Sequence, residues 1–129
     1  MPCPSSKLGL NVKIPGPDHP ITIEPAPERV TVRAGGRVIA DTKSALVLRE
    51  ASLRPVYYVP IADVDASAIK RSDSQTYCPY KGDASYYDVV TERGVIPDAI
   101  WTYEQPYDAV RQIAGHVAFY PHLVEVSAG

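Results

Sequence analysis

The sequence has few of the residues that mark specialised protein classes. Its 129 residues include two cysteines, one methionine, one tryptophan and one phenylalanine. Cys3 and Cys78 lie far apart, so they provide neither the paired spacing of a structural zinc site nor a disulfide framework. We therefore expect no metal, no cofactor, no bond between these two thiols, and a reducing, cytoplasmic location.

Strong charge and long apolar runs are absent as well. The chain carries 13 Lys and Arg against 15 Asp and Glu, a formal net charge of −2. Such a balance creates little attraction for nucleic acid or an anionic membrane. No apolar run approaches the roughly 18 residues of a membrane span, and nothing near Met1 has the pattern of a secretory leader. We expect neither nucleic acid nor membrane as a partner, and the oligomeric state stays open between monomer and dimer.

Proline is abundant, and it is concentrated at one end of the chain. Seven of the 13 prolines lie in residues 1–28. Proline lacks an amide donor and restricts the residue before it, which favours an extended segment. We expect residues 1–13 to form a flexible arm and residues 14–129 to form a single domain, since this length corresponds to one domain.

The rest of the chain has the pattern of short strands. Residues 29–34 and 37–41 alternate in polarity around Gly35-Gly36, which accepts positive φ, and predict a β-hairpin. Further strands are expected at residues 21–23, 45–49, 56–59, 84–91, 99–103, 116–120 and 123–126. Short helices are expected within residues 61–69 and 106–113. Because regular βαβ alternation is absent, we predict a mainly β, single compact antiparallel domain with two short helices.

Aromatic and polar residues gather in four segments, at residues 48–60, 77–87, 99–106 and 113–121. Two of these contain distinctive sequence motifs, Cys78-Pro79-Tyr80-Lys81-Gly82 and Gly115-His116-Val117-Ala118-Phe119-Tyr120. In combination they resemble a bacterial family catalogued as domain of unknown function 427, over about residues 14–126. The segment from Lys13 to Ile21 resembles the opening of one of its subgroups.

The resemblance implies a compact domain of β-tent architecture, similar to Mss4-like proteins, and it implies no settled activity. The family also carries a nucleotidyltransferase-like name. This chain lacks the Gly-Ser motif and paired aspartates that would hold two metal ions for that reaction. It also lacks the paired cysteines with which zinc-bearing β-tent relatives bind their ion.

Three residues are candidates for catalysis. Lys81 precedes a glycine in a turn, where it would either meet an anionic ligand, act as a desolvated nucleophile or remain in solvent. Glu50 ends an apolar strand and would orient Lys81, act as a general base or pair with Arg54 four residues later. His116 would act as an acid or base, or make a structural hydrogen bond. The other two histidines outside this set lie beside prolines and are interpreted as loop residues.

Five residues are candidates for ligand binding. Tyr58, Tyr86 and Trp101 would line an aromatic wall, the usual make-up of a small-molecule site, or pack as plain core. Cys78 would be a reactive thiolate beside the lysine, or a small buried hydrophobe. Arg54 completes the set.

Two functions from different classes are open. The first is a metal-independent small-ligand-binding protein with an aromatic pocket that holds a lysine and a glutamate. The alternative is a small enzyme that acts on a polar metabolite with Lys81 and either Glu50 or His116 as the acid–base pair. We predict that Glu50, Tyr58, Lys81, Tyr86 and Trp101 converge on one cavity, with His116 at its margin, although they come from four segments. In an open cleft Glu50 and Lys81 would face a ligand, whereas in a closed core they would pair with each other.

Overall fold

The computed structural model describes residues 12–129 and consists mainly of strands joined by turns. The strands are β1 (Ile21–Pro25), β2 (Val30–Ala34), β3 (Arg37–Thr42), β4 (Leu46–Glu50), β5 (Val56–Pro60), β6 (Ile69–Cys78), β7 (Gly82–Thr91), β8 (Gly94–Thr102), β9 (His116–Phe119) and β10 (Glu125–Ala128). The prediction of a mainly β domain is therefore confirmed.

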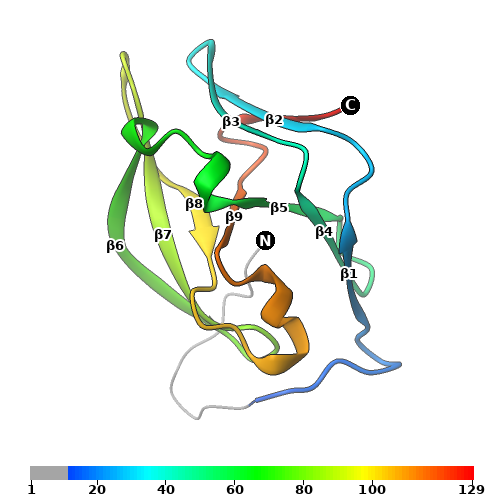
Figure 1. The fold of residues 1–129 in the computed structure, drawn as a ribbon. Coiled ribbons are helices and arrows are strands. Elements are labelled where there is room, and N and C mark those ends of the chain that lie inside the picture. Colours follow the sequence, from blue (N-terminus) through cyan, green and yellow to red (C-terminus); the bar gives the residue numbers. More distant parts are fainter. Residues whose placement is uncertain (1–11) are drawn as a thin grey trace.

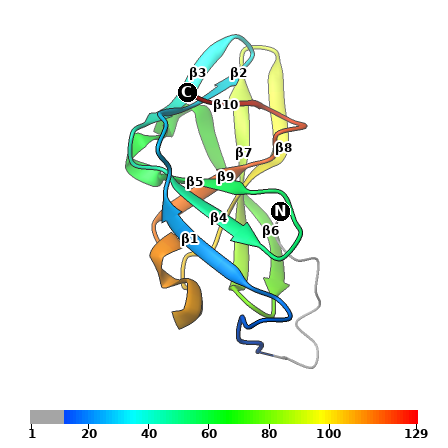
Figure 2. The same ribbon diagram turned by 90° about the vertical axis from the view of Figure 1, so that its right-hand side faces the viewer.

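The strands form two antiparallel sheets. The larger has seven strands in the order β1-β4-β5-β9-β8-β7-β6, and the smaller has the order β10-β2-β3. The larger sheet is open and bent, with β6 and β7 on one side of the molecule and β1 and β4 on the other (Figure 1). The smaller sheet lies across one end of the domain, which is the top of both views (Figure 2).

The predicted hairpin is confirmed in β2 and β3. Gly35 has a φ of 58° and Gly36 has a φ of 77°, and Ala34 pairs with Arg37 across the turn. Two consecutive positive φ angles match the twist of the flanking strands and are adopted most easily by glycine. The turn therefore fixes a register in which Val30 and Val32 are fully buried.

The two expected helices are 3-10 turns instead. The first region contains η1 (Ile61–Asp63) and η2 (Ala66–Ala68), which are separated by extended residues. Val64 bridges to β3, and the Asp65 amide donates to the Ile39 carbonyl at 2.8 Å, so pairing with the sheet interrupts the helix. The second region is η3 (Asp108–Ile113), where Val110 has a non-helical φ of −129°. Val110 is fully buried, and its packing overrides helical spacing.

The sequence patterns missed β6 altogether. Its first eight residues are mostly polar, with two basic residues, an aspartate and two serines, a composition of low strand propensity. It forms because seven of its ten residues pair with β7 in a long hairpin, on either side of a register shift between Arg71 and Gln75. The side chains of Ser72 and Ser74 both donate to the carboxylate of Asp98 on β8, at 2.5 and 2.6 Å. Cross-strand pairing thus outweighs local preference at this edge.

The core has two parts of different chemistry. The apolar cluster consists mainly of valine, alanine and isoleucine between the two sheets, including Val30, Val32, Ile39, Val59, Val89, Ile100 and Val117. The aromatic cluster lies on the opposite face of the larger sheet, because its strand residues alternate with those of the apolar cluster. It consists of Leu48, Tyr58, Cys78, Ala84, Tyr86, Trp101, Tyr103, Val110, Ile113 and Ala118. Four of the candidate site residues, Tyr58, Cys78, Tyr86 and Trp101, belong to this second cluster.

The arm expected at residues 1–13 lies mostly outside the described residues, as does Cys3. The absence of a bond between Cys3 and Cys78 therefore stays a prediction. At the described end of the arm, the Lys13 amide donates to the Pro79 carbonyl at 2.9 Å.

Candidate functional site

Lys81 is held in the tight turn between β6 and β7. Its amide donates to the Cys78 carbonyl at 3.2 Å, and its own carbonyl accepts from the Tyr107 amide at 3.0 Å. Gly82 follows with a φ of 108°, and a Cβ at this position would lie 3.4 Å from the Gln105 carbonyl oxygen. The glycine thus permits both the positive φ and the close approach of the next loop. This backbone directs the Lys81 side chain inward, where only 1% of it is exposed.

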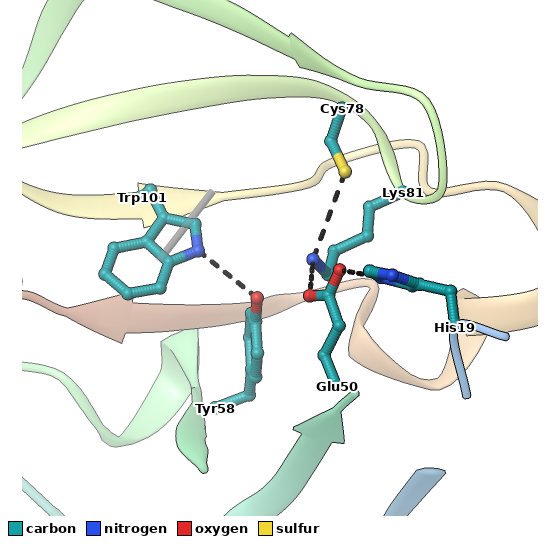
Figure 3. Close-up of polar contacts among 6 residues, drawn as sticks. All are labelled: His19, Glu50, Tyr58, Cys78, Lys81 and Trp101. Carbon is teal, nitrogen blue, oxygen red and sulfur yellow. Dashed lines mark hydrogen bonds and ion pairs between the residues drawn. The ribbon is translucent and has the colours of Figure 1, made fainter. Parts of the chain in front are cut away.

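Glu50 ends β4 and meets Lys81 in the interior. Its carboxylate lies between the Lys81 ammonium and the imidazole of His19 (Figure 3). Oε1 accepts a hydrogen bond from Lys81 Nζ, and Oε2 accepts one from His19 Nε2 at 2.6 Å. The Glu50 side chain is 4% exposed. Sequence reasoning offered Arg54 as an alternative partner, but Arg54 is exposed in the loop after β4.

The electrostatics of this contact keep Glu50 ionised. Burial by itself raises the pKa of the Glu50 carboxyl, because a charged group loses hydration. The hydrogen bonds and charges of Lys81 and His19 outweigh burial, and the net effect is a pKa below the usual value. An ionised carboxylate and an ammonium in contact form a pair without net charge, which is the arrangement in which buried charges are tolerated.

Sulfur and aromatic groups surround the ion pair. Cys78 Sγ lies 4.0 Å from Lys81 Nζ, and the centroid of the Tyr103 ring lies 5.9 Å from the same atom. Tyr58 on β5 and Trp101 on β8 meet edge to face, and the indole N–H donates to the Tyr58 hydroxyl at 3.2 Å. The two rings flank the carboxylate on the side opposite His19 (Figure 3). Charge and aromatic surface are thus brought together in one place.

His19 approaches Glu50 from the segment that precedes β1. Residues 12–20 are called the N-terminal strap below. Within it the His19 ring stacks on the Tyr80 ring, with centroids 4.1 Å apart and planes 9° from parallel. Lys13 Nζ lies 6.0 Å from the centroid of the same tyrosine ring. A surface hollow of about 350 Å³ is lined by the strap and Tyr80.

A sequence model of the family described as domain of unknown function (DUF427) matches residues 22–128. The chain belongs to this family. The resemblance drawn from the Cys-Pro-Tyr-Lys-Gly and Gly-His-Val-Ala-Phe-Tyr words is thereby confirmed. Glu50 and Lys81 lie inside the DUF427 match, whereas His19 lies before it. No curated protein shows significant similarity to the chain.

Most of the predicted site residues of this DUF427 domain lie together. Glu50, Lys81, Tyr58, Cys78 and Trp101 point toward one another (Figure 3). The sixth, Tyr86, belongs to the same aromatic cluster, and its hydroxyl shares a hydrogen bond with Thr76 at 2.9 Å. The ion pair is enclosed in the interior, and neither of its members lines the hollow at the strap.

His116 and Arg54 do not join this group through any contact seen in residues 12–129. His116 begins β9, and its Nδ1 lies 2.9 Å from the Ala114 carbonyl. Its own carbonyl accepts from the Thr102 hydroxyl at 2.7 Å. These contacts are those of a residue that holds the start of a strand. Arg54 is exposed.

His19 is the site residue that sequence reasoning missed. The sequence alone favours a loop residue at this position, because His19 lies beside a proline. The signal that would have found it is the register of β1 on β4, in which Ile21 pairs with Glu50. A residue two positions before Ile21 must then lie near the end of β4, but this register is not visible in the periodicity of a five-residue strand.

Within residues 12–129, no cluster of three or more histidine, cysteine, aspartate or glutamate side chains is arranged to hold a metal ion. In the same residues, no helix has the length and apolar character needed to cross a membrane.

Proposed function

We propose that this DUF427 domain binds a small polar ligand without a metal ion, at the place where Glu50 and Lys81 meet the aromatic cluster. One observation carries the proposal. The ion pair is almost wholly buried, yet one carboxylate oxygen, Glu50 Oε2, is turned toward a ring at the protein surface, that of His19. Oε2 is a hydrogen-bond acceptor of fixed position, and His19 stacks on the Tyr80 ring next to it. A few polar groups beside an aromatic surface are the composition of small-molecule sites.

A purely structural role explains the pair less well. Replacing a buried ion pair by packed apolar side chains is often neutral or stabilising, so stability alone gives little reason to keep one. Tyr58 and Trp101 are buried beside the pair in a mostly apolar cluster, so apolar side chains at these two positions would have apolar neighbours. We infer that the charges are kept because they recognise something, and that the lysine serves to hold the carboxylate ionised.

One observation favours the enzyme alternative. Lys81 and Glu50 are within hydrogen-bond reach of each other, which is the geometric condition for an acid–base pair. His19 extends the pair into a chain of three hydrogen-bonded groups. In this second proposal His19, rather than His116, would be the third member.

Retention of metabolites tests the proposed function. The full chain is mixed with a metabolite extract, separated by rapid gel filtration and analysed by mass spectrometry. The wild type is expected to retain a compound that Glu50→Gln loses. Glu125→Gln, the same change at an exposed residue of β10, is the matched control and should retain it. Equal retention by Glu50→Gln contradicts the proposal, as does a failure of both the wild type and His19→Ala, which lacks the ring against Glu50 Oε2, to retain any compound. Recovery of a chemically altered compound favours the enzyme.

The cellular location, architecture and partners expected from the sequence are part of the same proposal. We propose a bacterial, cytoplasmic domain of β-tent, Mss4-like architecture that has neither nucleic acid nor membrane as a partner. The net charge of −2 supports the absence of nucleic acid. The resemblance of the chain to its family supports the architecture.

A further inference from the structure

We propose that His19 occupies the ligand position of this site, so that the N-terminal strap acts as a built-in competitor. The ligand is then a planar heterocycle that stacks on Tyr80 and donates an N–H to Glu50. This inference rests on the proposed function and adds the class of ligand to it.

The His19 ring is held in the pose expected of a bound heterocycle. It lies flat on Tyr80, 4.1 Å between centroids, while Nε2 lies 2.6 Å from Glu50 Oε2. A carboxylate oxygen only accepts hydrogen bonds, so the imidazole is the donor. The ring therefore satisfies two requirements at once, an aromatic face and a directed N–H. These are the contacts through which proteins bind flat nitrogen heterocycles.

The N-terminal strap is attached to the rest of the domain at few points. Backbone hydrogen bonds hold it near its ends, from the Lys13 amide to Pro79 and from the Ala51 amide to the Pro20 carbonyl at 2.8 Å. Between these points Gly16 and His19 bond to each other rather than to a sheet. Ile14 is 83% exposed, so little apolar surface fixes the strap. The His19 ring is thus the part of the strap that is anchored in the site, and withdrawing it breaks few other contacts.

The family match does not include the strap that carries His19. The match begins at residue 22, which lies after the strap. Glu50, Tyr80 and Lys81 all lie within it. The acceptor, the stacking face and the charge-balancing lysine are therefore parts of the matched domain, whereas the ring that fills their site comes from outside it.

The chemistry of the position restricts the ligand. A phosphate or carboxylate placed where the imidazole lies would face the ionised Glu50 and be repelled. A neutral or cationic ring with an N–H is accepted, because Glu50 is already balanced by Lys81. The adjacent hollow of about 350 Å³, lined in part by Lys13 and Asp18, has room for substituents on such a ring. A purine-like base or an imidazole derivative meets these conditions.

The test removes the built-in ring and supplies a substitute. Binding of imidazole and of adenine to the full chain is measured by ligand-observed NMR, for the wild type and for His19→Ala. The measurement is made at a pH near 8.5, above the usual imidazole pKa of about 6.5. At this pH the two probes, imidazole and adenine, are neutral and can each donate an N–H. We expect His19→Ala to bind both probes at least about tenfold more tightly than the wild type, because the tethered His19 ring no longer competes.

Three controls separate the parts of the inference. 1-Methylimidazole has no N–H when neutral, and we expect it to bind His19→Ala about tenfold more weakly than imidazole does. The double variant His19→Ala/Glu50→Gln should lose the same preference. His122→Ala is the matched histidine control, because His122 also packs on a tyrosine, Tyr120, at 5.5 Å, and we expect it to behave like the wild type.

Each outcome decides one claim. Equal binding by the wild type and His19→Ala overturns the built-in competitor, while the proposed function stands or falls separately on metabolite retention. No binding of either probe by His19→Ala overturns the ligand class. If His19→Ala does not fold, recovery of its thermal transition on addition of imidazole, but not of 1-methylimidazole, supports the inference. Failure of imidazole to restore folding then overturns it.

Discussion

The apolar cluster and the aromatic cluster lie in one small domain, but they depend on different physics. In the apolar cluster, residues such as Val89 and Ile100 are fully buried and are held by shape and exclusion of water. At the aromatic cluster, Lys81 and Glu50 are buried to a similar extent. Each of these charged groups is tolerated in the interior because the other balances its charge. Burial therefore says little about sensitivity to mutation until the chemistry of the buried group is known.

The largest expected effect is the loss of one partner of the ion pair. Lys81→Ala leaves Glu50 buried beside His19 without its lysine, and we expect the free energy of unfolding to fall by about 3–5 kcal/mol. The measurement is urea denaturation at pH 7. The double change Lys81→Met/Glu50→Leu removes both charges and is expected to cost far less. If the double variant is as unstable as Lys81→Ala, the cluster does not depend on charge pairing.

The next effect is on the hydrogen bond between the two large rings. Tyr58→Phe removes the acceptor of the Trp101 indole N–H and leaves a buried donor without it. We expect a loss of about 1–3 kcal/mol in the free energy of unfolding. Ile100→Val, in the apolar cluster, is the comparison and should cost about 0.5–1.5 kcal/mol. A Tyr58→Phe variant as stable as the wild type would show that the ring contact alone is sufficient.

A smaller effect is expected in the turn that supports the apolar cluster. Gly36→Val places a β-branched residue at a φ of 77°, although nothing lies within 4 Å of the added Cβ. The strain is therefore conformational, and we expect it to cost about 1–2 kcal/mol. Calorimetric melting of this variant beside the wild type measures the cost. Unchanged melting would argue that the hairpin adjusts its turn.

How much of this was predictable differs between the two clusters. The hairpin at Gly35 and Gly36 was predicted correctly because alternation and turn chemistry act within a dozen residues. The gathering of Glu50 and Lys81 follows from their opposite charge and from the small size of the β domain, in which strands must pass close to one another. The role of His19 was not predictable, since it depends on how one short strand aligns with another, and no local pattern encodes that register.

The smallest expected effect concerns the response of the ion pair to acid. The lowered pKa of Glu50 is a net effect: burial raises it, and the contacts with Lys81 and His19 lower it by more. A carboxyl with a lowered pKa adds stability above its unfolded value, about 4.3, and this stability is lost as the pH falls through the folded pKa. The stability gap between wild type and Glu50→Gln should therefore be present at pH 7 and should shrink below about pH 4.

Urea midpoints of the two proteins between pH 7 and pH 3 measure this gap. Ile100→Val is a suitable control, since its deficit involves no titrating group and should stay constant over the same range. A gap for Glu50→Gln that is equally independent of pH would remove the distinction between the two clusters.

The position of β9 bears on the order in which the chain folds. β9 (His116–Phe119) pairs with β5 on one side and with β8 on the other, so within the larger sheet it joins β1-β4-β5 to β8-β7-β6. β9 follows β5 and β8 in the sequence, and its pairing with β5 closes a long stretch of chain. Such non-local contacts slow folding, with time constants of milliseconds to seconds for β domains of this size. The two groups of three strands therefore stay unconnected within the larger sheet until β9 has been synthesised and has paired with both.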